Sequence, residues 1–255
     1  MPMSIPELER ALRTLRLSGM TATLEARALQ VAHHQMDFLE AFSALVQDEL
    51  DRRHSRLLDR RHALSGLPEH KDLSSFDWGY NSRLPKRDVL ELATHQFIQA
   101  KEDVLIIGPP GTGKSHIAKA LADTAVQRGY KVLYREAHRL IEDLTEAREL
   151  GDLRKLRAQL HTADLLVIDD LFLRQLPAHA GDQLADVLMA RYEKASTVVT
   201  SNRPLDDWSR FLGDPVVVTP LLDRIMHHGH LLRFEGKSWR LKEAAARQAK
   251  RASVS

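Results

Sequence analysis

Residues 104–115 read Val104-Leu105-Ile106-Ile107-Gly108-Pro109-Pro110-Gly111-Thr112-Gly113-Lys114-Ser115. The apolar start of this stretch is typical of a buried β-strand, and the apolar positions that recur from His116 to Val126 predict a helix. Between the two lies a glycine-rich turn with the spacing G-x-x-x-x-G-K-S, which in this context is typical of a phosphate-binding P-loop. An ordinary glycine-rich turn with an exposed lysine is the alternative, and it is disfavoured because the motif is long and both of its flanks fit.

Each residue type in this motif has a chemical reason for its place. The glycines permit positive φ angles, so successive backbone N–H groups can surround a phosphate, and the dipole of the following helix adds positive potential. Lys114 supplies a countercharge for β- and γ-phosphates, and the hydroxyl of Ser115 can coordinate Mg²⁺. We therefore expect nucleotide contacts from Gly108, Pro109, Pro110, Gly111, Thr112, Gly113, Lys114, Ser115 and His116.

Length and composition indicate an ordinary globular chain. Its 255 residues can hold one α/β domain and a small accessory region. No apolar run approaches the ~20 residues of a membrane span, and residues 1–7 lack a basic region followed by an apolar one, so we expect a cytoplasmic protein with no membrane partner. The absence of cysteine excludes disulfides, thiol catalysis and cysteine-ligated zinc.

The chain is expected to have four parts. Apolar periodicity predicts helices over Ile5–Leu17 and Thr21–His33, separated by Ser18-Gly19, and a longer helix that starts near Asp37. Together they predict a helical domain that is small for independent folding. The expected parts are a helical N-terminal domain (1–68), a linker with a leading helix (69–100), an ATPase core (101–235) and a basic tail (236–255).

The linker gathers the aromatic residues Phe76, Trp78 and Tyr80 among turn-forming residues. They are interpreted either as anchors buried against the next domain or as rings that stack on nucleic acid, and the first interpretation is preferred. A helix over Lys86–Gln99 is then expected to lead into the first strand of the core.

Beyond the P-loop helix, strands and helices alternate, which predicts a parallel sheet covered on both faces. The expected strands are Lys131–Arg135, Asp164–Asp170, Ser196–Asn202 and Leu231–Phe234, and the expected helices are one that ends near Glu149, Asp152–Leu160 and His179–Lys194.

Polar side chains follow two of these strands. Asp169 and Asp170 end an apolar strand about 55 residues after Lys114, and ligands of such sheets collect at the carboxyl ends of strands. This is the Walker B arrangement, in which Asp169 would hold Mg²⁺ mostly through water and Asp170 would act as general base on the attacking water. Asn202 ends the next strand and could sense the γ-phosphate or orient the water, although a turn-forming asparagine before Arg203-Pro204 is the alternative.

Basic residues are unevenly distributed although the net charge is only +2. Residues 231–255 carry seven basic and two acidic side chains. This segment, a cluster on the third helix and a later helix are three candidate surfaces for phosphate-backbone contact, and a solvated surface is the alternative for each. The cluster comprises Arg52, Arg53, Arg56, Arg60 and Arg61, and the later helix, which we favour, is expected to expose Arg154, Lys155 and Arg157.

Four segments together resemble the AAA+ ATPases of the DnaC and IstB group. They are Gly108–Ser115, Leu165–Asp170, Val199–Pro204 and Leu221-Leu222-Asp223-Arg224-Ile225, which match Walker A, Walker B, sensor 1 and the box that carries an arginine finger. The resemblance covers residues 71–240, and the N-terminal segment Leu8–Met20 is similar to the insertion-sequence branch of the group.

The resemblance implies a five-stranded parallel sheet in the order 5-1-4-3-2, with ATP and Mg²⁺ held between subunits of a homo-oligomer. It also implies assembly on double-stranded DNA and recruitment or regulation of a cognate transposase, with Arg224 reaching the γ-phosphate of a neighbouring subunit. The chain departs from the family pattern at Phe172, where glycine is common, and is too short after the fifth strand for a full helical lid. Arg240 is a weak match to sensor 2.

Two other functions were weighed. A helicase loader of the DnaC type would share the motifs and would act on a protein ring and single-stranded DNA. A P-loop small-molecule kinase would need a basic lid over a second substrate, which the sequence lacks, and would leave Asp170 and Asn202 without a purpose. An ATP-dependent DNA-binding helper of insertion-sequence transposition is therefore the preferred function.

Overall fold

The computed structural model describes residues 3–173, 180–208 and 222–252. The chain divides into two compact units, Met1–Arg60 and Arg61–Ser255. Helix α3 (Phe38–Ser65) is continuous and contributes residues to both units. In the parts of the chain that the structure describes, no helix is long and apolar enough to cross a bilayer.

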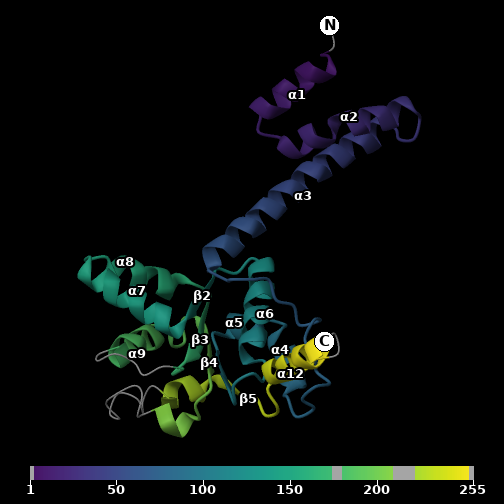
Figure 1. Cartoon of the computed structure of the whole chain (residues 1–255). Coiled ribbons are helices and arrows are strands. Elements are labelled where there is room, and N and C mark those ends of the chain that lie inside the picture. The colour runs from purple at the N-terminus through teal and green to yellow at the C-terminus, as the bar shows by residue number, and fades with distance from the viewer. Residues whose placement is uncertain (1–2, 174–179, 209–221, 253–255) are drawn as a thin grey trace. The chain divides into compact units, whose positions relative to one another are not determined.

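The first unit contains α1 (Ile5–Thr14), α2 (Ser18–Ala32) and most of α3 (Figure 1). The expectation that Ser18-Gly19 separates the first two helices was wrong, because these residues begin α2. Gly19 lies directly against the α3 backbone, where a Cβ would be only 2.6 Å from the Asp48 carbonyl oxygen. Its N–H donates to the buried carboxylate of Glu49 at 2.6 Å. Gly19 therefore serves a close approach of two helices rather than a helix end.

The second unit is built on a parallel sheet in the order β2-β3-β4-β1-β5, which confirms the predicted order. The strands are β1 (Asp103–Ile107), β2 (Val132–Glu136), β3 (Leu165–Leu171), β4 (Ser196–Ser201) and β5 (Gly229–Arg233). Their apolar runs are nearly continuous because both faces of a parallel sheet are covered.

Two apolar clusters occupy the two faces of the sheet, and alternate residues of β1 belong to each of them. Val104 and Ile106 pack with α4 (Lys86–Leu92), α5 (Gln96–Ala100) and α6 (Lys114–Gln127). Leu105 and Ile107 pack in the cluster formed with α7 (Ala137–Glu149), α8 (Leu153–Thr162) and α9 (Ala180–Arg191). This layering leaves the carboxyl end of β1 free to continue into the glycine-rich loop.

The expected single helix over Lys86–Gln99 is instead the pair α4 and α5. The break between α4 and α5 lies at His95, whose backbone is left-handed with a φ of 66°. The buried His95 imidazole donates from Nε2 to the Leu121 carbonyl of α6 at 3.1 Å. Of the linker aromatics, Phe76 and Trp78 pack against the first apolar cluster, as the anchor interpretation expects.

Within the basic tail (236–255), residues Trp239–Ala252 form helix α12, which follows β5 in the chain. The helix containing Arg224 is described over residues 222–227, and the first residue of the arginine box, Leu221, lies outside the described residues. A short 3₁₀ helix, η1 (Leu205–Asp207), follows β4.

Candidate nucleotide site

The glycine-rich loop joins β1 to α6, and its glycines have the φ angles that the motif predicts. Gly108 has φ 149°, and a Cβ there would collide with the Phe234 carbonyl. Gly113 caps α6 with φ 104°, and a Cβ there would lie 2.5 Å from the Phe76 ring. Both conformation and space therefore require glycine at these two positions.

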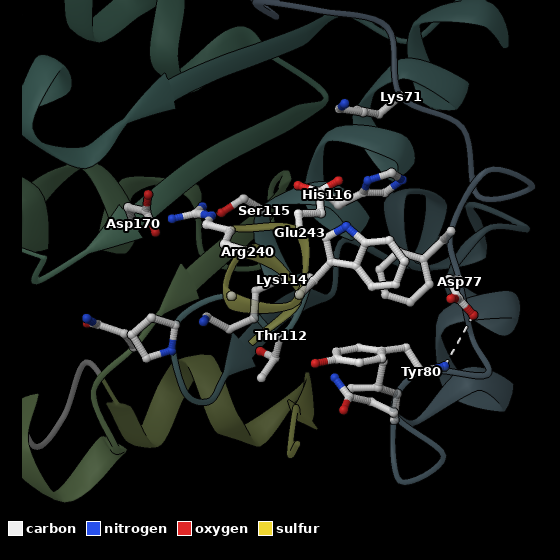
Figure 2. Close-up of a pocket in the computed structure, with 18 of the residues that line it drawn as sticks. Lys71, Asp77, Tyr80, Thr112, Lys114, Ser115, His116, Asp170, Arg240 and Glu243 are labelled. Atoms are coloured by element: carbon white, nitrogen blue, oxygen red, sulfur yellow. Dashed lines mark hydrogen bonds between the residues drawn. The ribbon is translucent and has the colours of Figure 1, made fainter. Parts of the chain in front are cut away.

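The loop forms one wall of a cavity of about 490 Å³, a volume within the usual range for small-molecule sites (Figure 2). Its lining joins three parts of the second unit: the phosphate loop, the polar ends of β3 and β4, and an aromatic wall shared by the linker and α12. The lining includes Pro110–His116, Asp170, Asn202, Phe76, Tyr80, Trp239 and Arg240.

Lys114 is 5% exposed, and its ammonium donates to the Pro109 carbonyl at 2.9 Å. Burial lowers the pKa of Lys114, whereas the charges of Asp170 and Asp169 act to raise it. A buried cation whose hydrogen bond goes to its own loop is well placed to exchange that carbonyl for a phosphate oxygen.

Asp169 is 2% exposed and is held by two hydroxyl groups. Tyr134 on β2 donates to Oδ2 at 2.6 Å, and Thr200 on β4 donates to Oδ1. Burial and the neighbouring Asp169 carboxylate raise the pKa of Tyr134, so its phenol stays protonated and remains a donor. The Thr200 hydroxyl also accepts the N–H of Asp170 at 2.9 Å, which links the two acids through one side chain.

Asp170 lies where β3 loses its register with β4, between Ile168 and Leu171. This β-bulge and a φ of 55° set Asp170 apart from the strand pleat, and its side chain lines the cavity. Burial, followed by the Asp169 charge, raises the pKa of Asp170. A carboxylate of raised basicity beside a phosphate loop fits the role of general base.

Phe172, where the family commonly has glycine, adopts the left-handed conformation that glycine favours, with φ 63°. The ring is 1% exposed and packs edge-on against Trp208 with centroids 5.1 Å apart. The turn is closed by the N–H of Leu173, which donates to the Asp170 carbonyl at 3.2 Å. Burial of an aromatic ring therefore offsets the backbone cost at this position.

Asn202 follows β4 and lines the same cavity as Asp170. Within the described ranges no group donates to its buried Oδ1. A buried amide oxygen without a protein donor beside a general base can accept a hydrogen bond from water.

Among the predicted nucleotide-site residues, Gly108, Pro109 and Asp169 do not line this cavity themselves, and neither does Arg224. Its guanidinium lies over the Tyr192 ring, 5.8 Å from the centroid, and donates to the Met189 sulfur at 3.6 Å. The side chain is exposed and does not line the cavity of its own chain.

Two contributors from α12 were underestimated in the sequence interpretation. Figure 2 shows the guanidinium of Arg240 directed toward Asp170. Its charge partly opposes the burial that raises the pKa of Asp170, and it adds to the burial that lowers the pKa of Lys114. The Trp239 ring belongs to the aromatic wall, and the backbone N–H of Trp239 donates to the Gly111 carbonyl at 2.9 Å. In the sequence, the adjacent Trp239-Arg240 pair just after the last strand was the only indication that this segment contributes to the cavity.

The predicted basic surfaces differ in how their cations are paired. On α8, Arg154 and Lys155 are exposed, whereas Arg157 is half-buried and pairs with Asp186 of α9 at 2.8 Å. In the first unit, Arg52 and Arg56 are exposed, as is Arg60, whereas Arg53 pairs with Glu49 at 2.6 Å.

The sequence model of a family described as "IstB-like ATP binding protein" matches residues 10–247. The chain belongs to this family. Curated relatives of this IstB-like chain include a candidate ATP-binding protein of insertion sequence IS21 from Pseudomonas aeruginosa, 35% identical and covering 93% of this chain and 89% of the relative. Another, from insertion sequence IS5376 of Geobacillus stearothermophilus, is 32% identical over 92% of this chain and 94% of the relative.

Solved structures show the same fold class, that of AAA+ P-loop ATPases. DnaA from Aquifex aeolicus with bound AMPPCP aligns with a TM-score of 0.57 and 23% identity, covering 72% of this IstB-like chain and 56% of DnaA. The DnaC helicase loader aligns with a TM-score of 0.52 and 19% identity, covering 69% of this chain and 99% of DnaC. At these identities the likeness shows the fold alone.

Proposed function

We propose that this protein is a Mg²⁺-dependent ATPase that binds duplex DNA as an oligomer and recruits or regulates the transposase of an insertion sequence. The observation that carries the ATPase assignment is the convergence of the phosphate loop, Asp170 and Asn202 on one cavity. The transposition assignment rests on the family and on relatives from insertion sequences that align over almost their full length.

The residues present fit a Mg²⁺ ion, because an oriented buried carboxylate and a serine hydroxyl are hard oxygen ligands. Ser115 would bind the ion directly, and Asp169 would hold it through water. When bound, Mg²⁺ neutralises charge on the β- and γ-phosphates. Tyr134 and Thr200 fix the Asp169 carboxylate, so its geometry is set before the ion arrives.

In the proposed hydrolysis, Asn202 orients a water molecule and Asp170 takes a proton from it. The water oxygen bonds to the γ-phosphorus while the bond to the β,γ-bridging oxygen breaks, which yields ADP and phosphate. Lys114 stays paired with the β- and γ-oxygens. Because the pKa of Asp170 is raised, turnover is expected to fall with decreasing pH earlier than it would with an ordinary aspartate base.

Arg224 is proposed to act on a neighbouring subunit. Its guanidinium is exposed and does not line the cavity of its own chain, so it is available to complete another site. A cation that reaches the γ-phosphate only in the assembled oligomer would couple hydrolysis to assembly.

DNA contact is proposed for the exposed Arg154 and Lys155 of α8, through phosphates and DNA shape rather than base edges. A helper that acts at many target sites has little use for direct base readout.

The experiment that tests the function combines the purified chain, duplex DNA and the cognate transposase. We expect DNA retention and transposase capture with Mg-ATP, and loss of both with the Lys114→Ala variant. Retention and capture that are the same with and without nucleotide would refute an ATP-dependent helper. Capture of a replicative helicase instead of the transposase would favour a loader.

A further inference from the structure

A cluster of two histidines and one aspartate lies in the second unit, apart from the residues that line the nucleotide cavity. His62 comes from the last turn of α3, His70 from the following linker and Asp123 from α6. Asp123 is 4% exposed, and one atom from each of the three side chains lies within 4.8 Å of the others. Two neighbouring segments, the end of α3 and the linker after it, and the distant helix α6 thus bring ligand-type atoms together.

The spacing of these atoms matches tetrahedral coordination. His70 Nδ1 lies 3.1 Å from Asp123 Oδ1, and His62 Nε2 lies 3.6 Å from the same oxygen. Zinc–nitrogen and zinc–oxygen bonds of ~2.0–2.2 Å at tetrahedral angles place neighbouring ligand atoms ~3.3–3.5 Å apart. The two observed separations bracket that value. The His62 and His70 rings are stacked, with centroids 3.8 Å apart, so coordination requires the exposed His70 ring to turn out of this stack.

Hydrogen bonds among the described residues do not satisfy every polar atom of this cluster. His62 Nε2 is buried, and in the described part of the chain it has no hydrogen-bond partner, because Asp123 is beyond hydrogen-bond distance. The nearby cations Lys71 and Lys119 pair with Glu69 instead, at 3.1 and 3.5 Å. A buried carboxylate therefore faces two imidazoles, one of which has an orphaned nitrogen.

Ligand chemistry selects the class of ion. Two imidazoles and one carboxylate suit Zn²⁺ and related transition-metal ions, whereas Mg²⁺ and Ca²⁺ prefer sets made only of oxygen. The His70 side chain is 73% exposed, which gives the ion a path from solvent and leaves room for water as a fourth ligand.

We propose that His62, His70 and Asp123 form a binding site for one zinc-class divalent ion. The ion fastens the end of α3 and the linker to α6, the helix that begins with Lys114 and Ser115. It thereby ties the segment that follows α3 to the nucleotide-binding helix without occupying the nucleotide cavity.

The test uses the full-length, metal-free chain without nucleotide and titrates Zn²⁺ in competition with a chromophoric chelator. One tightly bound Zn²⁺ per chain is expected, and His70→Gln should weaken its binding at least about tenfold. His70→Gln is the informative variant because the side chain is exposed and its loss does not threaten folding. Co²⁺ should give the visible absorption of a tetrahedral complex, and the same variant should lose it.

The matched control is His33→Asn/His34→Asn, which removes two exposed histidines from the turn directly after α2 and should leave the affinity unchanged. Asp123→Asn provides a near-isosteric second variant and should weaken binding as His70→Gln does. Absence of stoichiometric binding, or equal affinity in the wild-type and His70→Gln proteins, would overturn the site.

Discussion

Tyr134→Phe removes one hydroxyl from the buried network that orients Asp169. The phenol donates to Asp169 Oδ2 at 2.6 Å, and the side chain is 3% exposed, so water cannot readily replace it. Hydrogen bonds to charged groups contribute ~1.5–3 kcal/mol, and an unsatisfied buried acceptor costs a similar amount. The ring stays in place, so packing is preserved and the free energy of unfolding should fall by roughly 1–3 kcal/mol.

Tyr134→Phe should weaken the affinity for Mg²⁺ more than the affinity for ATP. Loss of a partner that orients a metal-binding carboxylate typically costs ~10–100-fold in metal affinity. We therefore expect the Mg²⁺ concentration for half-maximal ATPase activity to rise by roughly that factor. Binding of nucleotide without metal should change little, because the phosphate loop is untouched. The Thr200 hydroxyl still donates to Asp169, so part of the ATPase activity should remain in this variant.

The measurement is ATPase rate against free Mg²⁺, with chemical denaturation for stability. Tyr130→Phe is the matched control, because it removes a phenol that only accepts from Gln99 at the surface, at 3.2 Å. An unchanged Mg²⁺ requirement in Tyr134→Phe, relative to the wild-type and to Tyr130→Phe, would refute a positioning role for Tyr134.

Four further outcomes are expected. Lys114→Ala should abolish nucleotide binding in a calorimetric titration, since it removes the buried cation of the loop, and normal ATP affinity would contradict the site. Asp170→Asn should retain ATP yet hydrolyse it slowly, and an unchanged turnover rate would assign the base to another residue. Mixing Arg224→Ala with Lys114→Ala protein should restore part of the ATPase activity, and mixed oligomers that stay inactive would argue against a role between subunits. Arg154→Ala/Lys155→Ala should weaken duplex binding and flatten its log–log salt dependence by about 0.9 per lost phosphate contact, with ATP binding intact; an unchanged slope would place the DNA surface elsewhere.

The strands and the phosphate loop could be predicted from sequence because their signals are local. A continuous apolar run predicts a strand buried on both faces, and the glycine spacing predicts the loop wherever the run ends. The carboxyl ends of parallel strands share one edge, so Asp170 and Asn202 were expected near the loop before any coordinates.

Features that depend on distant partners could not be predicted in this way. His95 interrupts a helix, and its imidazole donates to the Leu121 carbonyl of another helix. Gly19 allows the close approach of α3. Both roles depend on contacts with another helix, which the local sequence pattern does not show. The pairing of Arg157 with Asp186 could not be predicted because Asp186 belongs to another helix. Tyr134 has the sequence context of a core residue, and only the pairing of β2 with β3 brings its hydroxyl to Asp169.

The hydrogen bond from the backbone N–H of Trp239 to the Gly111 carbonyl affects how the chain can be shortened or tagged. Removing residues from Trp239 onward to discard the basic tail would also delete part of the cavity wall and expose a peptide group of the phosphate loop. A deletion designed to map DNA contacts would then lower nucleotide affinity as well. Charge-neutralising substitutions beyond Glu243 are the cleaner way to study the tail, and affinity tags at this terminus belong after α12 rather than in place of it.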